Sequence, residues 1–427
     1  MGIGVLDLSD SNLRLWHEDT TVQSPGYALF QGSEYQFGAP ARAAARLQPR
    51  DINTRYWWQL STEALQPALG PARHTGDLAH AHLKQLHQEA SRPSEVLLAV
   101  SGSMQREQLA LLLGIVQQCP FDAVGLINRS VALGSLYGGE RIFHLEIQLH
   151  QAVISELTRH NNQIELQRTT PIPGCGLLQL QERLVELIAA AFVRQARFDP
   201  RRKADSEQQL YDALPVALRT LQNTAETNLE VSGYQARISA NELYAAGKQL
   251  FDSARESIGA MRPDDQIIAD PLAVLLPGLT ATFEGIAVLQ PDDVRRALQA
   301  HQAQLVQRDQ ALSFVTTLPC LDAEVASSHA ANKTPPVTSS AVKRPAQAST
   351  AQPTHVLYRH RAQPLIETGT TLEGGGVIYR GNQGWQLRDS GTPAIVNGAT
   401  YRSGQILTCG DTIHIGSDVA LLIEVVV

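Results

Sequence analysis

The sequence predicts an α/β domain joined by a flexible linker to a small all-β domain. Along residues 1–321, short apolar runs alternate with stretches of helical spacing, which is typical of buried sheets covered by helices. Residues 322–353 are rich in Ala, Ser, Thr and Pro and contain no aromatic side chain, so they bury too little apolar surface to offset their ordering entropy. Residues 354–427 carry short strand-like runs between Gly, Asn and Asp turns, a pattern that indicates a β-sandwich.

The elements of the first domain follow from the period of its apolar residues. Uninterrupted or alternating apolar runs indicate strands, and leucines that recur every three or four positions indicate helices. The expected strands are GIGVLDL (2–8), SNLRLWHED (11–19), EVLLAVS (95–101), a strand beginning at residue 121, and the alternating segment 141–159. The expected helices cover 76–90, 104–119, 176–195 and 291–315. No internal repeat of fixed period is apparent.

Composition argues against several classes of function. The chain has 427 residues, enough for two or three domains, and its 43% hydrophobic and 18% charged residues are typical of soluble globular proteins. The net charge of −7 and the lack of a long basic block do not favour binding to nucleic acid or to an anionic membrane. The N-terminus has no signal-peptide pattern, and no apolar run is long enough to cross a bilayer. We therefore expect a cytoplasmic protein whose partners are one or more other proteins.

Residue types that bind metals or act as nucleophiles form no convincing pattern. The cysteines lie far apart, which fits a reducing cytosol and excludes a zinc spacing: Cys119, Cys175, Cys320 and Cys409. His80, His82 and His87 share a predicted helix, but their offsets do not form a three-ligand face, so we expect surface histidines and no metal. Trp57 and Trp58 are expected in the core or at an internal interface.

The order of segments in residues 1–290 resembles that of the DnaK-type heat-shock chaperones of the actin-like ATPase superfamily. VLDLSDSN (5–12) is similar to their first phosphate loop, FGAPARAAA (37–45) to their lysine-bearing segment, and 95–138 to their strand–helix–strand–helix block. IFHLEIQLHQAVISEL (142–157) stands at the second phosphate loop, GCGLLQLQERLVELIAAAF (174–192) at the next helix, and AVLLPGLT (273–280) at the adenosine strand. The resemblance implies a two-lobed actin-like ATPase fold for residues 1–321.

The first phosphate loop departs from the family pattern at positions that would contact a nucleotide. Asp7 keeps the first acidic position, but Ser9 stands where the loop glycine belongs, and Asp10 replaces a hydroxyl that would face a phosphate. Arg42 replaces the lysine, which keeps the positive charge but not its compact geometry. The adenosine turn around Gly278 is also altered.

The second phosphate loop departs further. His144 replaces an acid, and Glu146, Ile147 and Gln148 replace three glycines. Glycines let the backbone approach the phosphates, so these side chains would fill the phosphate space, and Glu146 would set a second anion beside Asp10. The resemblance thus implies a degenerate nucleotide site at Asp7, Ser9, Arg42, His144 and Gly278, with no catalytic residue and no resident cofactor.

Residues 384–425 resemble the C-terminal half of forkhead-associated domains, which implies a domain of that type for residues 354–427. The resemblance rests on Asp389, Val396-Asn397-Gly398 and the run from Leu407 to Gly416, which includes Gly410-Asp411 and the alternating Ile413 and Ile415. The family's phosphothreonine site needs a Gly-Arg pair and a Ser-x-x-His loop, and neither is found in register. The docking candidates are Arg359, Arg361, Arg380 and Asn397, and phosphate-independent protein docking is expected rather than phosphopeptide binding.

Three hypotheses for function remain open. The first is a non-catalytic scaffold or adaptor, in which a pseudo-ATPase domain carries a tethered docking module. The second is a nucleotide-responsive switch that binds ATP or ADP with magnesium and changes its affinity for partners. The third is a chaperone-type ATPase, although the chaperones' peptide-binding module is not found after residue 290. We expect the first.

Overall fold

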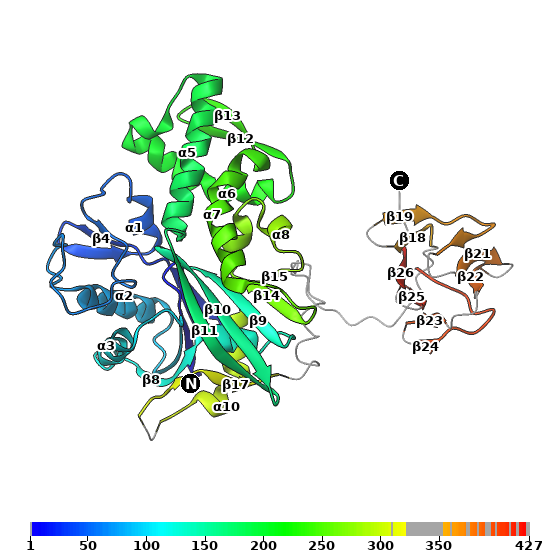
Figure 1. The fold of residues 1–427 in the computed structure, drawn as a ribbon, viewed down its shortest axis with the longest axis horizontal. Coiled ribbons are helices and arrows are strands. Elements are labelled where there is room, and N and C mark those ends of the chain that lie inside the picture. The colour runs from blue at the N-terminus through cyan, green and yellow to red at the C-terminus, as the bar shows by residue number, and fades with distance from the viewer. Residues whose placement is uncertain are drawn as a thin grey trace. The chain divides into compact units, whose positions relative to one another are not determined.

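A computed structural model describes residues 2–308, 311–321 and 353–423, apart from 359–360, 373–375, 382–383, 389–393, 398, 410 and 416–417. The chain is a mixed α/β protein with several sheets (Figure 1). It divides into two compact units, Met1–Lys333 and Thr334–Val427, and each has its own hydrophobic core. Apart from Pro353, the predicted linker 322–353 lies outside the described residues.

The first sheet of the first unit has the strand order β16-β8-β7-β1-β2-β3. Its strands are β1 (Gly4–Leu8), β2 (Leu13–His17), β3 (Thr20–Ser24), β7 (Glu95–Val100), β8 (Asp122–Asn128) and β16 (Phe314–Val315). β1, β7 and β8 run parallel, and β2 and β3 follow β1 as an antiparallel meander. The continuous apolar runs of β1 and β7 are buried on both faces, as expected for central parallel strands.

The second sheet has the strand order β15-β14-β9-β10-β11-β17. Its strands are β9 (Arg141–Ile147), β10 (Gln151–His160), β11 (Gln163–Pro173), β14 (Asp265–Ala269), β15 (Ala287–Val288) and β17 (Thr317–Pro319). β9, β14 and β15 run parallel, and β10 and β11 follow β9 as an antiparallel meander. The strands β15-β14-β9-β10-β11 thus have the same order and directions as β8-β7-β1-β2-β3 in the first sheet. The unit therefore contains a structural repeat, although no repeat is apparent in its sequence.

Helices cover these sheets. The longer ones are α2 (Thr75–Glu89), α3 (Arg106–Val116), α5 (Leu177–Ala196), α6 (Ala204–Leu221) and α7 (Ala240–Ile258). α2 and α3 pack in the core of the first sheet, and α5, α6 and α7 pack in the core of the second. α7 shows why these segments become helices: its leucines lie on one buried face, and Ser239 and Glu242 form a capping box at its start.

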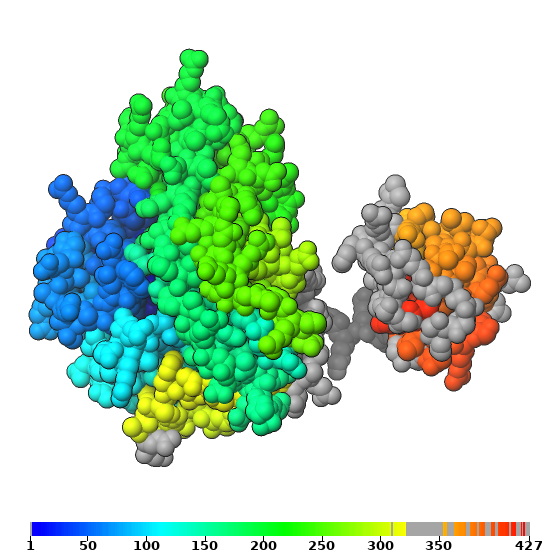
Figure 2. Space-filling model, in the orientation of Figure 1, coloured from blue at the N-terminus to red at the C-terminus, as the bar shows by residue number. Residues whose placement is uncertain are grey.

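The remaining elements are short. They are α1 (Ala39–Ala43), α4 (Arg129–Gly134), α8 (Leu279–Thr282), α9 (Asp293–Ala300), α10 (Gln302–Leu305), the 3₁₀ turns η1 (Pro200–Arg202) and η2 (Ala273–Leu275), and the strands β4 (Ala28–Gln31), β5 (Glu34–Phe37), β6 (Ile52–Asn53), β12 (Glu226–Val231) and β13 (Tyr234–Ser239). A small cluster of Tyr27, Leu29, Ala41 and Leu149, with the start of α5 against it, joins the regions of the two sheets. In Figure 2 the blue N-terminal segment lies against the green helical region.

Two sequence predictions in this unit are wrong. Residues 291–315 do not form one helix, because α9 and α10 break at His301, and Phe314–Val315 pair with β8 as an edge strand. The expected strand at 273–280 is a 3₁₀ turn followed by a short helix, and the preceding residues form the strand β14 instead. At residues 314–315 sheet pairing, a tertiary interaction, overrides the local pattern.

The expectation of surface histidines on α2 is also wrong for His82 and His87, which are buried. The indole N–H of Trp57 donates to Nδ1 of His82 at 3.2 Å, so Nε2 carries the proton and donates to Ser24 Oγ at 2.7 Å. Burial lowers the pKa of His82 to about 3. His82 is therefore a neutral core residue that braces α2 against β3.

The second unit consists, in its described residues, of two sheets. One has the order β19-β18-β26-β25-β23-β24 and the other β20-β21-β22. The strands are β18 (His355–Tyr358), β19 (Arg361–Pro364), β20 (Thr370–Thr371), β21 (Val377–Gly381), β22 (Gly384–Arg388), β23 (Ala394–Val396), β24 (Ala399–Thr400), β25 (Thr412–Ile415) and β26 (Asp418–Ile423). Side chains from both sheets share one core, with Val356, Ile378, Trp385 and Ile413 among its members.

Candidate functional site

Two hairpin tips meet in the interior of the first unit. The β1–β2 tip contains Asp10, and the β9–β10 tip, which has the equivalent place in the second sheet, contains Leu149. The backbone N–H of Leu149 donates a hydrogen bond to Oδ1 of Asp10 at 2.8 Å. Both residues are buried. The tips of the two repeats are thus bonded directly to each other.

The second tip is fixed in turn by the start of α5. The backbone N–H groups of Leu177 and Leu178 donate to the carbonyls of Gln148 and Leu149 at 2.8 and 3.1 Å. Gly176, which precedes the helix, approaches the tip so closely that an added Cβ would lie 2.3 Å from the carbonyl carbon of His150. The first turn of α5 therefore satisfies its free N–H groups with the hairpin backbone, a place where a helix can otherwise receive an anion.

A buried ion-pair cluster lies at the ends of the central strands. Arg129, the first residue of α4, donates through Nε to Asp7 at 2.7 Å and through Nη2 to Asp270 at 2.9 Å. All three side chains are less than one-tenth exposed. Asp7 is the last but one residue of β1, and Asp270 directly follows β14 in the other sheet. Arg129 therefore links the two sheets through both carboxylates.

His144 on β9 completes this cluster. Its Nδ1 is 2.8 Å from Ser130 Oγ, and its Nε2 is 3.5 Å from both Arg129 Nη1 and Asp270 Oδ1. The ring is fully buried. His144 therefore fills space and supplies hydrogen bonds where the resemblance implies an acidic residue.

Glu146, two residues further along β9, is buried in a polar group of its own. Ser101 Oγ donates to its Oε2 at 2.9 Å, and Gln148 Nε2 donates to its Oε1 at 3.2 Å. Gln148 Nε2 also lies 2.8 Å from Ser101 Oγ. These three side chains close a hydrogen-bonded ring from β9 to the residue that follows β7.

The pKa values of the buried carboxyl groups in this site shift in different directions. Burial raises the pKa of Asp10 to about 7, against the opposing hydrogen bond from Leu149, and the Glu146 carboxylate adds to the rise. Burial also raises the pKa of Glu146 and of Asp7. For Asp270, the cost of burial is outweighed by Arg129 and His144, which hold its pKa below the ordinary value. Arg129 stays charged, because its carboxylate neighbours outweigh its own burial.

The cavity that Asp10, Ser101 and Gln148 line is small. A cavity of about 220 Å³ lies against Asp10, Trp57, Ser101 and Gln148, whereas sites for drug-sized ligands are usually about 300–1,000 Å³. Among the described residues, no group of His, Cys, Asp and Glu has an arrangement that could hold a metal ion. The polar side chains of the ion-pair cluster are hydrogen-bonded to one another.

The residues predicted from the sequence are only partly brought together. Asp7 and His144 meet through Arg129, and Ser9 lies in the first tip with its Oγ 3.2 Å from Ser11 Oγ. Arg42 lies on α1 and lines a different cavity. Gly278 directly precedes α8 with a φ of 91° and faces Tyr244, whose ring would contact an added Cβ. Among the interactions found for the described residues, none joins Arg42 or Gly278 to the cluster.

Sequence reasoning missed Arg129 and Asp270. Arg129 directly follows β8, in the sequence INR, and Asp270 directly follows β14, in the sequence IIAD. The available signal was a charged residue at the end of an apolar run. The carboxyl ends of neighbouring parallel strands share one edge, which is where such residues gather. What could not be foreseen was that the two edges face each other.

The docking candidates of the second unit have varied surroundings. Arg380 on β21 donates to Glu367 at 2.7 Å. Asn397 has a φ of 51°, donates to Asp411 at 2.7 Å, and accepts from the Thr412 N–H at 2.9 Å, so its side chain braces a turn. Arg361 lies in β19, and Arg359 lies outside the described residues.

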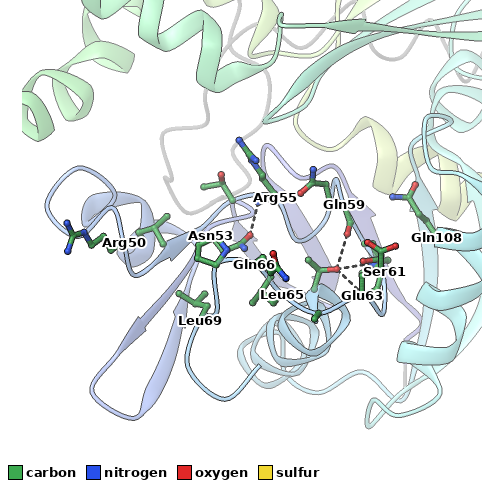
Figure 3. A pocket seen from close by; sticks show the side chains of 16 residues that line it. Arg50, Asn53, Arg55, Gln59, Ser61, Glu63, Leu65, Gln66, Leu69 and Gln108 are labelled. Atoms are coloured by element: carbon green, nitrogen blue, oxygen red, sulfur yellow. Dashed lines mark hydrogen bonds between the residues drawn. The ribbon is translucent and has the colours of Figure 1, made fainter. Parts of the chain in front are cut away.

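A separate, open pocket of about 930 Å³ lies beside β6 and the segment that leads to α2 (Figure 3). Its wall is held by Thr75, whose Oγ1 donates to the Gln59 carbonyl at 2.9 Å and accepts from the Ser61 N–H at 2.8 Å. Arg50 and Arg55 are among its lining residues. None of the buried carboxylates lines this pocket.

Comparison with known proteins finds no family model that matches this chain and no curated protein that is significantly similar to it in sequence. In the part of the chain that the structure describes, no helix has the length and apolar character needed to cross a bilayer.

Proposed function

We propose that this chain is a non-catalytic scaffold or adaptor, in which a pseudo-ATPase domain of the DnaK and actin-like type carries a tethered, forkhead-associated-like docking module. The repeated sheet topology of the first unit supports the two-lobed fold that the sequence resemblance implies. The second unit, with two β-sheets around one core, is compatible with the proposed docking module.

The observation that carries the proposal is the salt-bridged Arg129 between Asp7 and Asp270. In an active ATPase of the DnaK and actin-like type, the carboxylate at the position of Asp7 would face the metal ion and the phosphates. Here its carboxylate already accepts a hydrogen bond from a buried guanidinium that it shares with Asp270. Removing one partner of a buried ion pair costs about 3–5 kcal/mol, because the remaining charge is left uncompensated. Entry of magnesium and triphosphate would have to displace this arrangement.

The contact between Asp10 and Leu149 gives independent support. A phosphate chain would need to lie between the two hairpin tips, where backbone N–H groups could reach it. In this chain the Leu149 N–H is bonded to a carboxylate instead. Asp10 and Glu146 would also repel the phosphates. The proposed role therefore depends on the shape of the domain and on its tethered module, since linked binding modules gain avidity through effective concentration.

The test is a thermal-unfolding titration of the full chain with ATP and ADP, each with magnesium. A ligand of the folded state must raise the melting temperature, and we expect no change at millimolar nucleotide. Steady phosphate release should also be absent. A saturable rise in melting temperature without phosphate release would favour the nucleotide-responsive switch. Phosphate release abolished by Asp7→Ala would establish the ATPase instead.

The docking module has its own test, a phosphothreonine peptide array probed with the full chain. We expect no binding that requires the phosphate. Phosphate-dependent binding that is lost in Arg380→Gln would overturn this part of the proposal, and Arg402→Gln serves as the matched control because Arg402 is exposed in the same unit.

A further inference from the structure

A second cavity of the first unit has a chemistry unlike that of the buried cluster. Its volume is about 400 Å³, and it lies between the β1–β2 hairpin on one side and α5, α6 and η2 on the other. The wall on the helical side is built from aliphatic side chains, including Leu180, Leu184, Leu214 and Leu275. This volume falls within the usual range for small-molecule sites.

The rim of this cavity is cationic. Arg14, Arg42 and Arg219 line it, and no Asp or Glu does. Arg42 and Arg219 are exposed, and no ion pair or side-chain hydrogen bond is found for either guanidinium among the described residues. By contrast, Arg46 nearby lies within 3.7 Å of both Glu182 and Glu207, so its charge is compensated. Arg14 donates through Nη1 to the Pro291 carbonyl at 2.7 Å, so the charges available to an anion are those of Arg42 and Arg219.

These two features select the ligand. An aliphatic wall favours an alkyl chain, because each methylene removed from water adds to the hydrophobic free energy of binding. A guanidinium favours a carboxylate or a phosphate, to which it donates paired hydrogen bonds. None of the lining residues is aromatic, so the cavity offers no ring on which a nucleotide base could stack.

We propose that this cavity binds a single-chain anionic amphiphile, with its carboxylate or phosphate head at Arg42 and Arg219 and its alkyl chain along the leucines of α5 and α6. The lining comes from both repeats, from Asn12 and Arg42 in the first and from Leu184 and Leu214 in the second. A bound ligand therefore stabilises the arrangement of the two repeats that forms the cavity. This gives the pseudo-ATPase domain an effector site that does not depend on nucleotide.

The probe for this site is 11-(dansylamino)undecanoic acid, whose fluorescence rises when it enters an apolar environment. It is titrated with the full chain and then displaced by competitors, all kept below their micelle concentrations. We expect displacement by dodecanoate and by dodecyl phosphate, and the stronger of the two identifies the head group. Dodecanol should compete about tenfold more weakly, which corresponds to about 1.4 kcal/mol. Butyrate and inorganic phosphate should not compete.

The variant Arg42→Gln/Arg219→Gln should lose about tenfold in affinity for dodecanoate while its affinity for dodecanol stays unchanged. Both arginines are exposed, so the variant should fold, and circular dichroism checks this. Arg106→Gln, an exposed arginine on α3, is the matched control. Leu275→Gln should weaken dodecanoate and dodecanol alike, because it places an amide in the path of the chain.

Three results would overturn the proposal. They are no saturable binding of the probe, equal competition by dodecanol and dodecanoate, and an unchanged affinity in the double arginine variant. Displacement of the probe by ATP or ADP with magnesium more strongly than by dodecanoate would also overturn it, and would count against the pseudo-ATPase assignment as well. If only the probe and dodecanoate experiments fail, the pseudo-ATPase assignment is not affected, because the nucleotide titration tests it separately.

Discussion

The carboxylate of Asp10 accepts a hydrogen bond from the backbone N–H of Leu149 at 2.8 Å, and this bond joins the tips of two hairpins that have equivalent places in two sheets of the same topology. Most buried carboxylates are paired with a cation. Asp10 instead depends on N–H donors and on a proton, since its pKa is raised to about 7. The junction between the repeats is therefore sensitive to pH near neutrality.

The first prediction concerns this pH dependence. Asp10 has an ordinary pKa of 3.8 and a folded-state pKa of about 7, so between these values the folded chain holds the proton and the unfolded chain does not. The stabilising effect is complete below about pH 4 and is lost as the pH rises through 7. Asp10→Asn keeps an acceptor for Leu149 but cannot ionise. Its stability relative to the native chain should rise by a few kcal/mol between pH 5 and pH 8.

The measurement is urea unfolding of both chains from pH 5 to pH 8, reported as the difference in the free energy of unfolding. A difference is needed because His82, with its lowered pKa, makes the native chain less stable as the pH falls from about 6.5. Asp264→Asn, an exposed position, controls for the change in net charge. A difference that does not change with pH would show that Asp10 is ionised throughout.

The second prediction concerns Arg129. Arg129→Met leaves Asp7 and Asp270 buried without their guanidinium, and we expect a loss of about 3–5 kcal/mol in the free energy of unfolding. Replacing both aspartates by asparagine in the same chain should restore most of the loss, because the uncompensated charges are gone. The measurement is urea unfolding at pH 7.

Arg106→Met tests the same chemical change at an exposed position and should stay within about 0.5 kcal/mol of the native chain. If Arg129→Met were as stable as the native chain, the cluster would have to be hydrated, and the central argument against nucleotide binding would fall.

The third prediction compares two glycines. In Gly176→Ala the new methyl group would lie within 2.5 Å of backbone atoms of residues 149–151, which cannot move without breaking the junction with Asp10. We expect a loss of about 3 kcal/mol or more. Gly114→Ala lies on the exposed face of α3 with nothing within 4 Å, and it should stabilise the chain by about 0.5–1 kcal/mol. Thermal unfolding of both variants checks the pair, and similar effects would contradict the close approach.

The fourth prediction concerns the second unit. Asn397→Gly keeps the positive φ but removes the bonds to Asp411 and Thr412, and Asn397→Ala also strains the backbone. We expect both to lower the melting temperature of the second unit, with alanine worse by about 1 kcal/mol. Calorimetry of the full chain should show the first unit's transition unchanged, because the units have separate cores. A shift of both transitions by the same amount would contradict this independence.

Much of the fold could be predicted from local pattern. The buried runs of β1 and β7 and the leucine spacing of α2 and α5 appear in the structure within a few residues of their predicted bounds. The pattern failed at β16, where a strand pairs at a sheet edge, and at His82, where a polar ring is buried by partners distant in sequence. Local spacing carries no information about such partners.

The sequence by itself determined where the apolar and polar residues of this protein lie along the chain, and thereby its α/β class and its first central strands. Only the tertiary structure decided that the two sheets repeat one topology, that Arg129 reaches carboxylates of both, and that Arg42 turns toward an aliphatic cavity. The physical reason is that backbone preference and apolar spacing act over a few residues, whereas ion pairing and packing join residues more than 100 positions apart.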